Sequence, residues 1–197
     1  MTTPATVSDF EHKRRAIVDG AAEVFAEKGF VAGTTKDIAA KVGLSQPAIY
    51  HYAETKEELL REIAVRVDTD MKRALDAALD LEEDDRTRLR AFVHNFTDAV
   101  VDNRLTFAVY YKEMHQLPPD LRDRIRRAER EFVREVGGLV QTLQEDGILP
   151  ADASSTVVAE GIVGMVSWVH RWYRPDGPLT AASIADTFLK LIGLDGR

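Results

Sequence analysis

Apolar residues recur every three or four positions along this chain, which is the spacing of one face of an α-helix. The first such run contains Phe10, Ile17, Ala21 and Phe25. No stretch shows the strict apolar–polar alternation that predicts a half-buried strand, and no segment repeats at a fixed period. We therefore expect an all-α protein of about nine helices.

Glycines, prolines and capping residues divide this periodic pattern into separate helices. The expected ranges are 10–28, 34–42, 45–52, 55–81, 82–102, 107–114, 118–147, 153–173 and 180–192. The second and third helices are short, and Gly43 lies in the tight turn between them. Two short helices that each carry one apolar side and are joined in this way predict a helix-turn-helix.

The charge of the chain is unevenly distributed. Its 26 basic and 33 acidic residues give a formal net charge of −7, which by itself argues against binding to nucleic acid. Up to Lys56, however, seven basic residues balance seven acidic ones, so the acidic excess belongs to the remainder. We call the residues up to Lys56 the head and the remainder the body. A neutral head can bind phosphates, while the acidic body is repelled by them.

Several function classes are excluded by what the sequence lacks. It contains no cysteine, which removes disulfides, thiolate metal sites and thiol catalysis. The polar stretch Met1–Asp9 does not resemble a signal peptide, and the most apolar stretch, Val157–Val169, is too short for the roughly 20 residues that span a bilayer. We expect a cytoplasmic protein with no membrane partner, no metal and no cofactor.

Residues 29–60 contain a specific order of motifs. These are Thr34-Thr35, Asp37-Ile38-Ala39, Gly43-Leu44-Ser45, Ile49-Tyr50 and Lys56-Glu57-Glu58-Leu59-Leu60. In this order they resemble the DNA-binding domain of the TetR family of bacterial transcriptional regulators. The resemblance implies a helix-turn-helix DNA-binding domain over 1–54 and a ligand-binding and dimerisation domain over 55–197. The chain departs from the family at Ala53, where a phenylalanine is usual, and we expect thinner packing behind the recognition helix.

The recognition helix of such a domain presents its first residues to base edges in the major groove. Here Gln46 can hydrogen-bond to adenine, while Pro47 and Ala48 can contact a thymine methyl group. The candidate phosphate donors around them are Thr34, Thr35, Lys36, Ser45, Tyr50, His51, Tyr52 and Lys56. The resemblance implies a backbone-contacting role for Tyr50 and Lys56. The alternative for each polar residue is structural, since any helical protein needs capping hydroxyls and buried rings.

For the body of the chain, the resemblance implies that the last two helices pair with those of a second copy in a four-helix bundle. The candidate interface residues are Val158, Gly161, Ile162, Met165, Ile184, Phe188 and Leu191. The alternative is that these residues close the core of the protomer itself. A two-fold dimer is also what a palindromic operator requires.

Aromatic and methionine residues are candidates for the lining of an apolar effector cavity. They are Phe107, Tyr110, Tyr111, Met114, Phe132, Met165, Trp168 and Trp172, and each is equally compatible with plain core packing. The arginines between residues 122 and 134 form either a solvated face with helical ion pairs or a cradle for phosphates. The segment 168–179 resembles regulators of lipid, fatty-acid and steroid degradation, some of which respond to acyl-CoA thioesters. On that resemblance Arg127 would bind the coenzyme A phosphates.

The sequence thus predicts a homodimeric repressor that binds a palindromic DNA operator and is released by a small molecule, an acyl-CoA or another lipid-like effector. Two alternatives stay open. Ala53 is compatible with a helical interaction protein whose head no longer binds DNA. An enzyme assembled from distant residues is the other, although the chain has no metal-binding histidine pair, no nucleophile elbow and no phosphate-binding loop.

Overall fold

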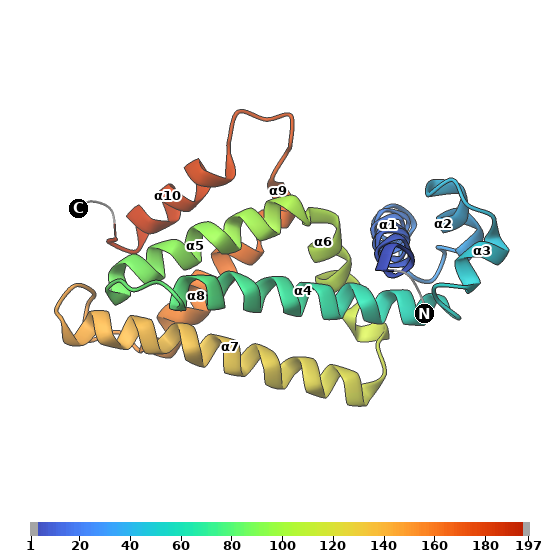
Figure 1. The fold of residues 1–197 in the computed structure, drawn as a ribbon. Coiled ribbons are helices and arrows are strands. Elements are labelled where there is room, and N and C mark those ends of the chain that lie inside the picture. The colour runs from blue at the N-terminus through green and yellow to red at the C-terminus, as the bar shows by residue number, and fades with distance from the viewer. Residues whose placement is uncertain (1–3, 195–197) are drawn as a thin grey trace. The chain divides into compact units, whose positions relative to one another are not determined.

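A computed structural model describes residues 4–194, and in that range every regular element is a helix. The elements are α1 (Pro4–Lys28), α2 (Thr35–Lys41), α3 (Gln46–Tyr50), α4 (Lys56–Leu79), α5 (Asp85–Asp102), α6 (Arg104–Glu113), the 3₁₀ turn η1 (Met114–Gln116), α7 (Pro119–Glu145), α8 (Ser155–Ser167), α9 (Val169–Trp172) and α10 (Ala181–Leu191) (Figure 1). The prediction of an all-α fold is confirmed. None of the helices in the described part is long and apolar enough to cross a membrane.

The chain packs as two compact units. Unit 1 comprises the described residues up to Val67 together with Leu105–Arg122, and unit 2 comprises Asp68–Arg104 together with the described residues from Asp123 onward. Helix α4 therefore contributes its first half to unit 1 and its second half to unit 2. The boundary expected at residue 54 concerns functional domains and stays a prediction, whereas the packing places α6 in the same unit as the N-terminal helices.

Unit 1 contains the helix-turn-helix. Helix α1 buries Ile17, Ala21 and Phe25, α2 buries Ile38, and α3 buries Ile49, so the apolar side of each helix faces inward. Glycines in the left-handed region end α1 and α2, with φ of 81° at position 29 and 69° at position 43. Because other side chains rarely adopt such φ values, these two glycines set the directions in which α2 and α3 leave their turns.

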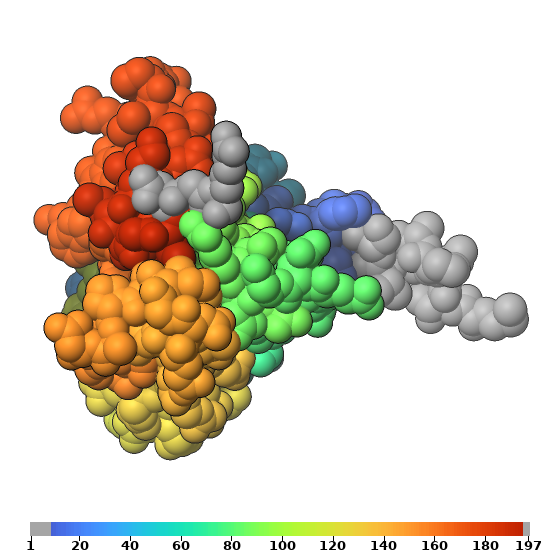
Figure 2. All heavy atoms as spheres, turned by 90° about the vertical axis from the view of Figure 1, so that its left-hand side faces the viewer, coloured from blue at the N-terminus to red at the C-terminus, as the bar shows by residue number. Residues whose placement is uncertain are grey.

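Unit 2 is built around α5, which packs against α8, α9 and α10. Phe92 and Phe96 on α5 stack on one another, and both meet Phe132 of α7 edge to face at 5.7 and 5.9 Å between ring centroids. Gly137 of α7 lies close to α8, since an added Cβ would be 3.9 Å from Ala159 Cβ. Figure 2 views unit 2 from the end at which α7 gives way to α8 and α5 begins.

The single helix expected over 153–173 is two helices, divided at Trp168. His170 donates from Nδ1 to the Ser167 carbonyl at 2.6 Å, while the Arg171 amide bonds to Trp168 instead. Burial lowers the pKa of His170, and the positive charges of Arg171 and Arg104 act in the same direction. The neutral imidazole of His170 therefore donates to the Ser167 carbonyl, which in a continuous helix would accept from the Arg171 amide. This interruption has no local sequence signal.

The close contact between α1 and α2 generates a stability prediction. An alanine Cβ at Gly20 would lie 2.3 Å from Cγ1 of Val42. We expect Gly20→Ala to destabilise the protein by about 1–3 kcal/mol, because the branched valine cannot move aside without a shift of backbone. Urea unfolding followed by circular dichroism measures this change.

The matched control is Gly138→Ala, since nothing lies within 4 Å of a Cβ built at that helical glycine. This substitution should stabilise α7 by up to about 1 kcal/mol. The Gly20→Ala cost should largely disappear when it is measured in a Val42→Ala background. An equal cost in both backgrounds would contradict a steric origin.

Candidate nucleic-acid interface

Two of the predicted DNA-binding hydroxyls cap helices. Thr34 accepts from the Asp37 amide at 3.1 Å, and the Asp37 carboxylate accepts the Thr34 amide at 3.1 Å, which completes a capping box at the start of α2. Hydrogen bonds from Lys28 and Thr34 lower the pKa of Asp37 to about 2. Ser45 accepts from the Ala48 amide at the start of α3. Thr34 and Ser45 thus have the structural role of helix caps, and their contacts to DNA stay a prediction.

A short chain of hydrogen bonds joins the beginning of α2 to both ends of α3. The side-chain amide of Gln46 donates from Nε2 to Thr35 Oγ1 at 3.0 Å. The same hydroxyl lies 3.3 Å from the phenolic oxygen of Tyr50. Gln46 is exposed and Tyr50 is 49% exposed, so polar groups of both face solvent. These three predicted contact residues are brought together, and we call them the Gln46–Thr35–Tyr50 chain.

Further predicted contact residues surround this chain. Lys36, Pro47 and His51 are exposed, and Ala48 is half-buried. An exposed ammonium group on α2 and two short side chains at the start of α3 are therefore close in sequence to Thr35 and Gln46. Such a set combines a phosphate-binding charge with groups small enough to allow close approach to base edges.

Tyr52 and Ala53 follow the recognition helix and pack inside the head. The Tyr52 ring is half-buried and stacks on Phe10 of α1 with 4.9 Å between centroids. Ala53 is 3% exposed, so the position is enclosed although the phenylalanine typical of the family is absent. The expectation that this substitution thins the packing stays a prediction. The stacking restricts Tyr52, whose predicted role was a phosphate contact.

Lys56 is committed to the protein in this structure. Its ammonium group donates to the carbonyl oxygens of Phe30 and Val31 at 2.9 and 3.0 Å, with the Gly33 carbonyl at 3.4 Å. It also lies 4.7 Å from the centroid of the Phe30 ring. These donors hold the turn between α1 and α2, and the predicted phosphate contact of Lys56 stays a prediction.

Glu113 holds the same turn from α6 and was not predicted from the sequence. Glu113 is 5% exposed, and its carboxylate accepts from the Phe30 amide at 3.2 Å. Lys112 Nζ lies 3.8 Å from the same oxygen. One feature of the sequence could have identified it: Glu113 is an acidic residue at the end of a helix whose buried face also contains Phe107, Val109 and Tyr110. We call Lys56, Glu113 and the turn that they hold the 29–34 clamp.

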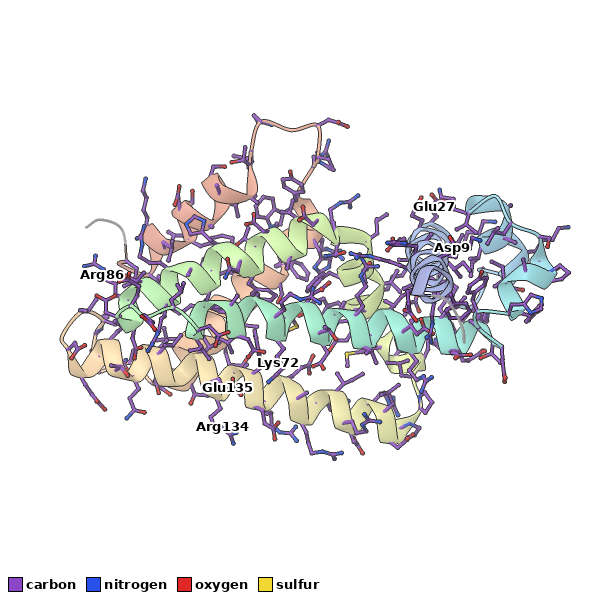
Figure 3. All side chains as sticks on the ribbon, in the orientation of Figure 1. Asp9, Glu27, Lys72, Arg86, Arg134 and Glu135 are labelled. Carbon is purple, nitrogen blue, oxygen red and sulfur yellow. The ribbon has the colours of Figure 1, made fainter. Side chains whose placement is uncertain are left out.

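The other cationic groups of the head are largely neutralised. The ion pairs are Lys13–Asp9, Arg14–Glu62, Lys28–Asp37, Lys41–Glu23, Lys41–Glu27 and Arg66–Asp19. Glu27 lies on α1 and is labelled in Figure 3. Lys36 is exposed in the first turn of α2, directly after Thr35.

Comparison with known proteins gives the family. Residues 17–63 match "Bacterial regulatory proteins, tetR family", and residues 82–194 match "Tetracyclin repressor-like, C-terminal domain". The chain belongs to the TetR family. It is thus a transcriptional regulator built on a helix-turn-helix, which favours regulation over the enzyme and interaction-protein alternatives.

Individual relatives extend over nearly the whole of this TetR-family chain. The transcriptional repressor KstR2 of Rhodococcus jostii is 29% identical, covering 98% of this chain and 97% of the relative. The crystal structure of PfmR from Thermus thermophilus is 27% identical with a TM-score of 0.80, covering 89% and 96% of the two chains. AibR in complex with isovaleryl coenzyme A and operator DNA is 25% identical with a TM-score of 0.76, covering 91% and 98%.

The predicted effector residues do not form one buried set. In unit 1, Phe107 and Tyr110 are buried and Tyr111 is 39% exposed, with Met114 half-buried. In unit 2, Phe132 belongs to the aromatic cluster around α5, and Met165 is half-buried. These positions are compatible with plain core packing, and their role as effector contacts stays a prediction.

Three predicted effector residues lie on the surface of unit 2. Trp168 and Trp172 are 56% and 41% exposed, and Arg171 covers the Trp168 ring at 5.1 Å. Arg127 is exposed on the face of α7 opposite its buried residues, and Arg134 on the same helix also extends into solvent in Figure 3. This exposure agrees with the solvated-face alternative, and the role of Arg127 as a contact to coenzyme A phosphates stays a prediction. The helical spacing alone explains why the arginines share a solvated face.

The predicted dimer residues also divide into two groups. Ile162 and Ile184 are 1% and 3% exposed, so they belong to the core of unit 2, which is the alternative interpretation. Gly161 and Leu191 are exposed, the latter by 70%, and Val158, Met165 and Phe188 are half-buried. The exposed face of α8 continues through Val157, Gly164 and Trp168. This face follows from the register of the helix, which the sequence pattern left uncertain.

The 29–34 clamp generates a testable prediction. Glu113→Ala should destabilise the protein by about 1–3 kcal/mol, because it leaves the buried Phe30 amide without its acceptor. Glu113→Gln keeps a carbonyl oxygen at the same distance along the side chain and should remain closer to wild type. Urea unfolding of the two variants measures the difference. Equal stability of Glu113→Ala and wild type would show that the hydrogen bond contributes nothing.

Proposed function

We propose that this chain is a transcriptional repressor whose two copies bind a palindromic operator and leave it when an acyl-CoA thioester binds. The observation that carries the DNA-binding part is the exposed Gln46–Thr35–Tyr50 chain beside Lys36 on a helix-turn-helix. A regulator that binds the chromosome acts in the cytoplasm.

Base recognition is assigned to α3. In a helix-turn-helix the second helix enters the major groove with its N-terminal residues against base edges. Gln46 and Pro47 are exposed at that end of α3, so they would reach the bases first. Lys36 and Tyr50 carry donors beside them and would contact phosphates. Lys56 would act indirectly, by holding the turn before α2 in place.

Dimerisation is assigned to the exposed face of α8 and to Leu191 on α10. Val157, Gly161, Gly164 and Trp168 lie at helical spacing on this face, beside exposed Glu160, and two glycines leave its centre without a bulky side chain. An exposed apolar surface of this kind is typical of an interface, and a two-fold pair would place two recognition helices on the two halves of a palindrome.

The effector proposal is supported by the relatives. AibR has been crystallised with both isovaleryl coenzyme A and operator DNA, and KstR2 is named as a repressor. The arginines of α7 lie on the solvated face. We therefore propose that they would bind the coenzyme A phosphates at the surface of unit 2 and not between its helices. A different lipid-like effector is the alternative.

The 29–34 clamp supplies a route by which an effector could change operator affinity. Lys56 begins α4 and Glu113 ends α6, and both hold the turn that leads into α2. A ligand that favours another setting of α4 or α6 would shift this turn and with it the Gln46–Thr35–Tyr50 chain. Coupling free energies between such sites are typically about 1–3 kcal/mol.

Operator binding is tested with the full-length protein. We expect selection from a random DNA-duplex library to yield a palindrome and gel shifts to show binding to it. Gln46→Ala should relax base preference at the matching position in each half-site, by roughly 1–3 kcal/mol of discrimination. Lys36→Ala should weaken binding to all sequences and reduce the salt dependence. Failure of the wild-type protein to select any sequence at moderate salt would refute the proposed function.

Effector binding is tested by thermal shift with isovaleryl-CoA, longer acyl-CoAs, the free acids and coenzyme A alone. A ligand present at 100 times its Kd should stabilise the protein by about 2.7 kcal/mol and raise its Tm. We expect acyl-CoAs to do so and to release the selected operator in gel shifts, whereas the free acids do neither. Stabilisation by free acids alone would favour a lipid-like effector without coenzyme A.

A further inference from the structure

We propose that Thr35 determines operator specificity by fixing which end of the Gln46 side-chain amide faces the bases, so that adenine is preferred over guanine. Thr35 would be a positioning residue that acts through Gln46. The inference rests on the proposed DNA-binding function and adds to it the residue that sets the base preference.

A glutamine side chain by itself does not choose between these bases. Its amide carries an oxygen acceptor on one side and an NH₂ donor on the other, and rotation by 180° exchanges the two. In the major groove adenine presents the N7 acceptor and the N6 amino donor, whereas guanine presents the N7 and O6 acceptors. A glutamine with its oxygen directed at the base pairs with adenine, and one with its NH₂ group directed at the base can serve guanine.

The hydrogen bond to Thr35 removes this freedom. Gln46 Nε2 donates to Thr35 Oγ1 at 3.0 Å. We take the donated hydrogen to be the one that points away from the amide oxygen, since the other hydrogen lies beside Oε1, where a bidentate pair with a base needs it. Oε1 and the remaining Nε2 hydrogen are then both available on the exposed side of α3. These two groups match N6 and N7 of adenine in a bidentate pair. Guanine would place its O6 acceptor against Oε1, which is also an acceptor.

Tyr50 keeps the Thr35 oxygen in its accepting role. The Thr35 hydroxyl has one hydrogen, and the Tyr50 oxygen lies 3.3 Å away. When the Tyr50 hydroxyl donates to a DNA phosphate, its oxygen accepts the hydrogen of Thr35. Thr35 then has no hydrogen to offer to Gln46 and can only accept from it. Phosphate docking and base recognition are thereby connected through one hydroxyl group.

The hydroxyl of Thr35 has no capping duty that would account for it. Thr34 is the N-cap of α2 and forms the complete capping box with Asp37. Thr35 is the first residue of the helix and is half-buried, so its hydroxyl is free to serve the contacts between α2 and α3. Replacing it therefore removes the Gln46–Thr35–Tyr50 chain without removing the cap.

The first experiment compares base preference with overall affinity. The palindrome selected by the wild-type protein is remade with guanine in place of adenine at the position that Gln46→Ala identifies, in both half-sites. We expect wild type to prefer adenine by about tenfold or more. Thr35→Val, which removes the hydroxyl but keeps the shape, should reduce this ratio to about threefold or less, and Thr35→Ser should restore it. Tyr50→Phe should lower the ratio in the same direction.

The second experiment is a double-mutant cycle that separates positioning from other roles. In a Gln46→Ala background, Thr35→Val should leave the adenine-to-guanine ratio unchanged, because the group on which Thr35 acts is gone. Lys36→Ala is the matched control on α2, and it should lower affinity for both operators equally. Thermal unfolding of each variant confirms that the head is folded.

Three outcomes would overturn the inference while leaving the proposed function intact. Thr35→Val with the wild-type base ratio would show that the hydroxyl has no effect on recognition. An equal loss of affinity for both operators would show that Thr35 only contacts phosphate. A change of ratio that persists in the Gln46→Ala background would show that it acts by another path. If the wild-type protein selected no operator at all, the proposed function itself would fail.

Discussion

The turn between α1 and α2 is fixed by two oppositely charged side chains from outside the helices that it joins. Lys56 binds its carbonyl oxygens and Glu113 binds its Phe30 amide. An irregular turn exposes backbone polar groups that burial would leave unsatisfied, and the 29–34 clamp satisfies them from α4 and α6. Because α2 starts directly after this turn, every group of the Gln46–Thr35–Tyr50 chain takes its position from that clamp.

The elements that the sequence predicts well are those with local causes. Thr34, Ser45, Thr55 and Thr180 cap helices near the predicted starts, because a hydroxyl that accepts from the amide three residues later needs only the helix itself. The break at Trp168 was not predicted, since it depends on a buried histidine ring that bonds the Ser167 carbonyl. Helical periodicity continues through that point, and only the tertiary environment of His170 reveals the interruption.

The candidate site was predicted in part for the same reason. Gln46, Thr35 and Tyr50 were each identified as contact residues. The sequence does not reveal that their side chains lie within hydrogen-bonding distance, because Thr35 is 11 residues away from Gln46 and 15 from Tyr50. Lys56 was assigned to phosphate because an ammonium near a recognition helix has that chemistry. Its partners are backbone carbonyls, which no residue pattern displays. Ile162 and Leu191 show the same limit, because periodicity predicts an apolar face but not what covers it.

Charge pairing explains how an acidic protein can present a DNA-binding head. Lys28 and Lys41 form ion pairs with carboxylates of the head. The zero net charge of the residues up to Lys56 therefore reflects specific ion pairs between neighbouring side chains. Such exposed pairs contribute little stability, but they remove competing positive charge from the sides of the head. Lys36 stays exposed beside Thr35. In the proposed complex, the ammonium group of Lys36 would attract phosphate near the amide of Gln46, which favours one docking orientation among many.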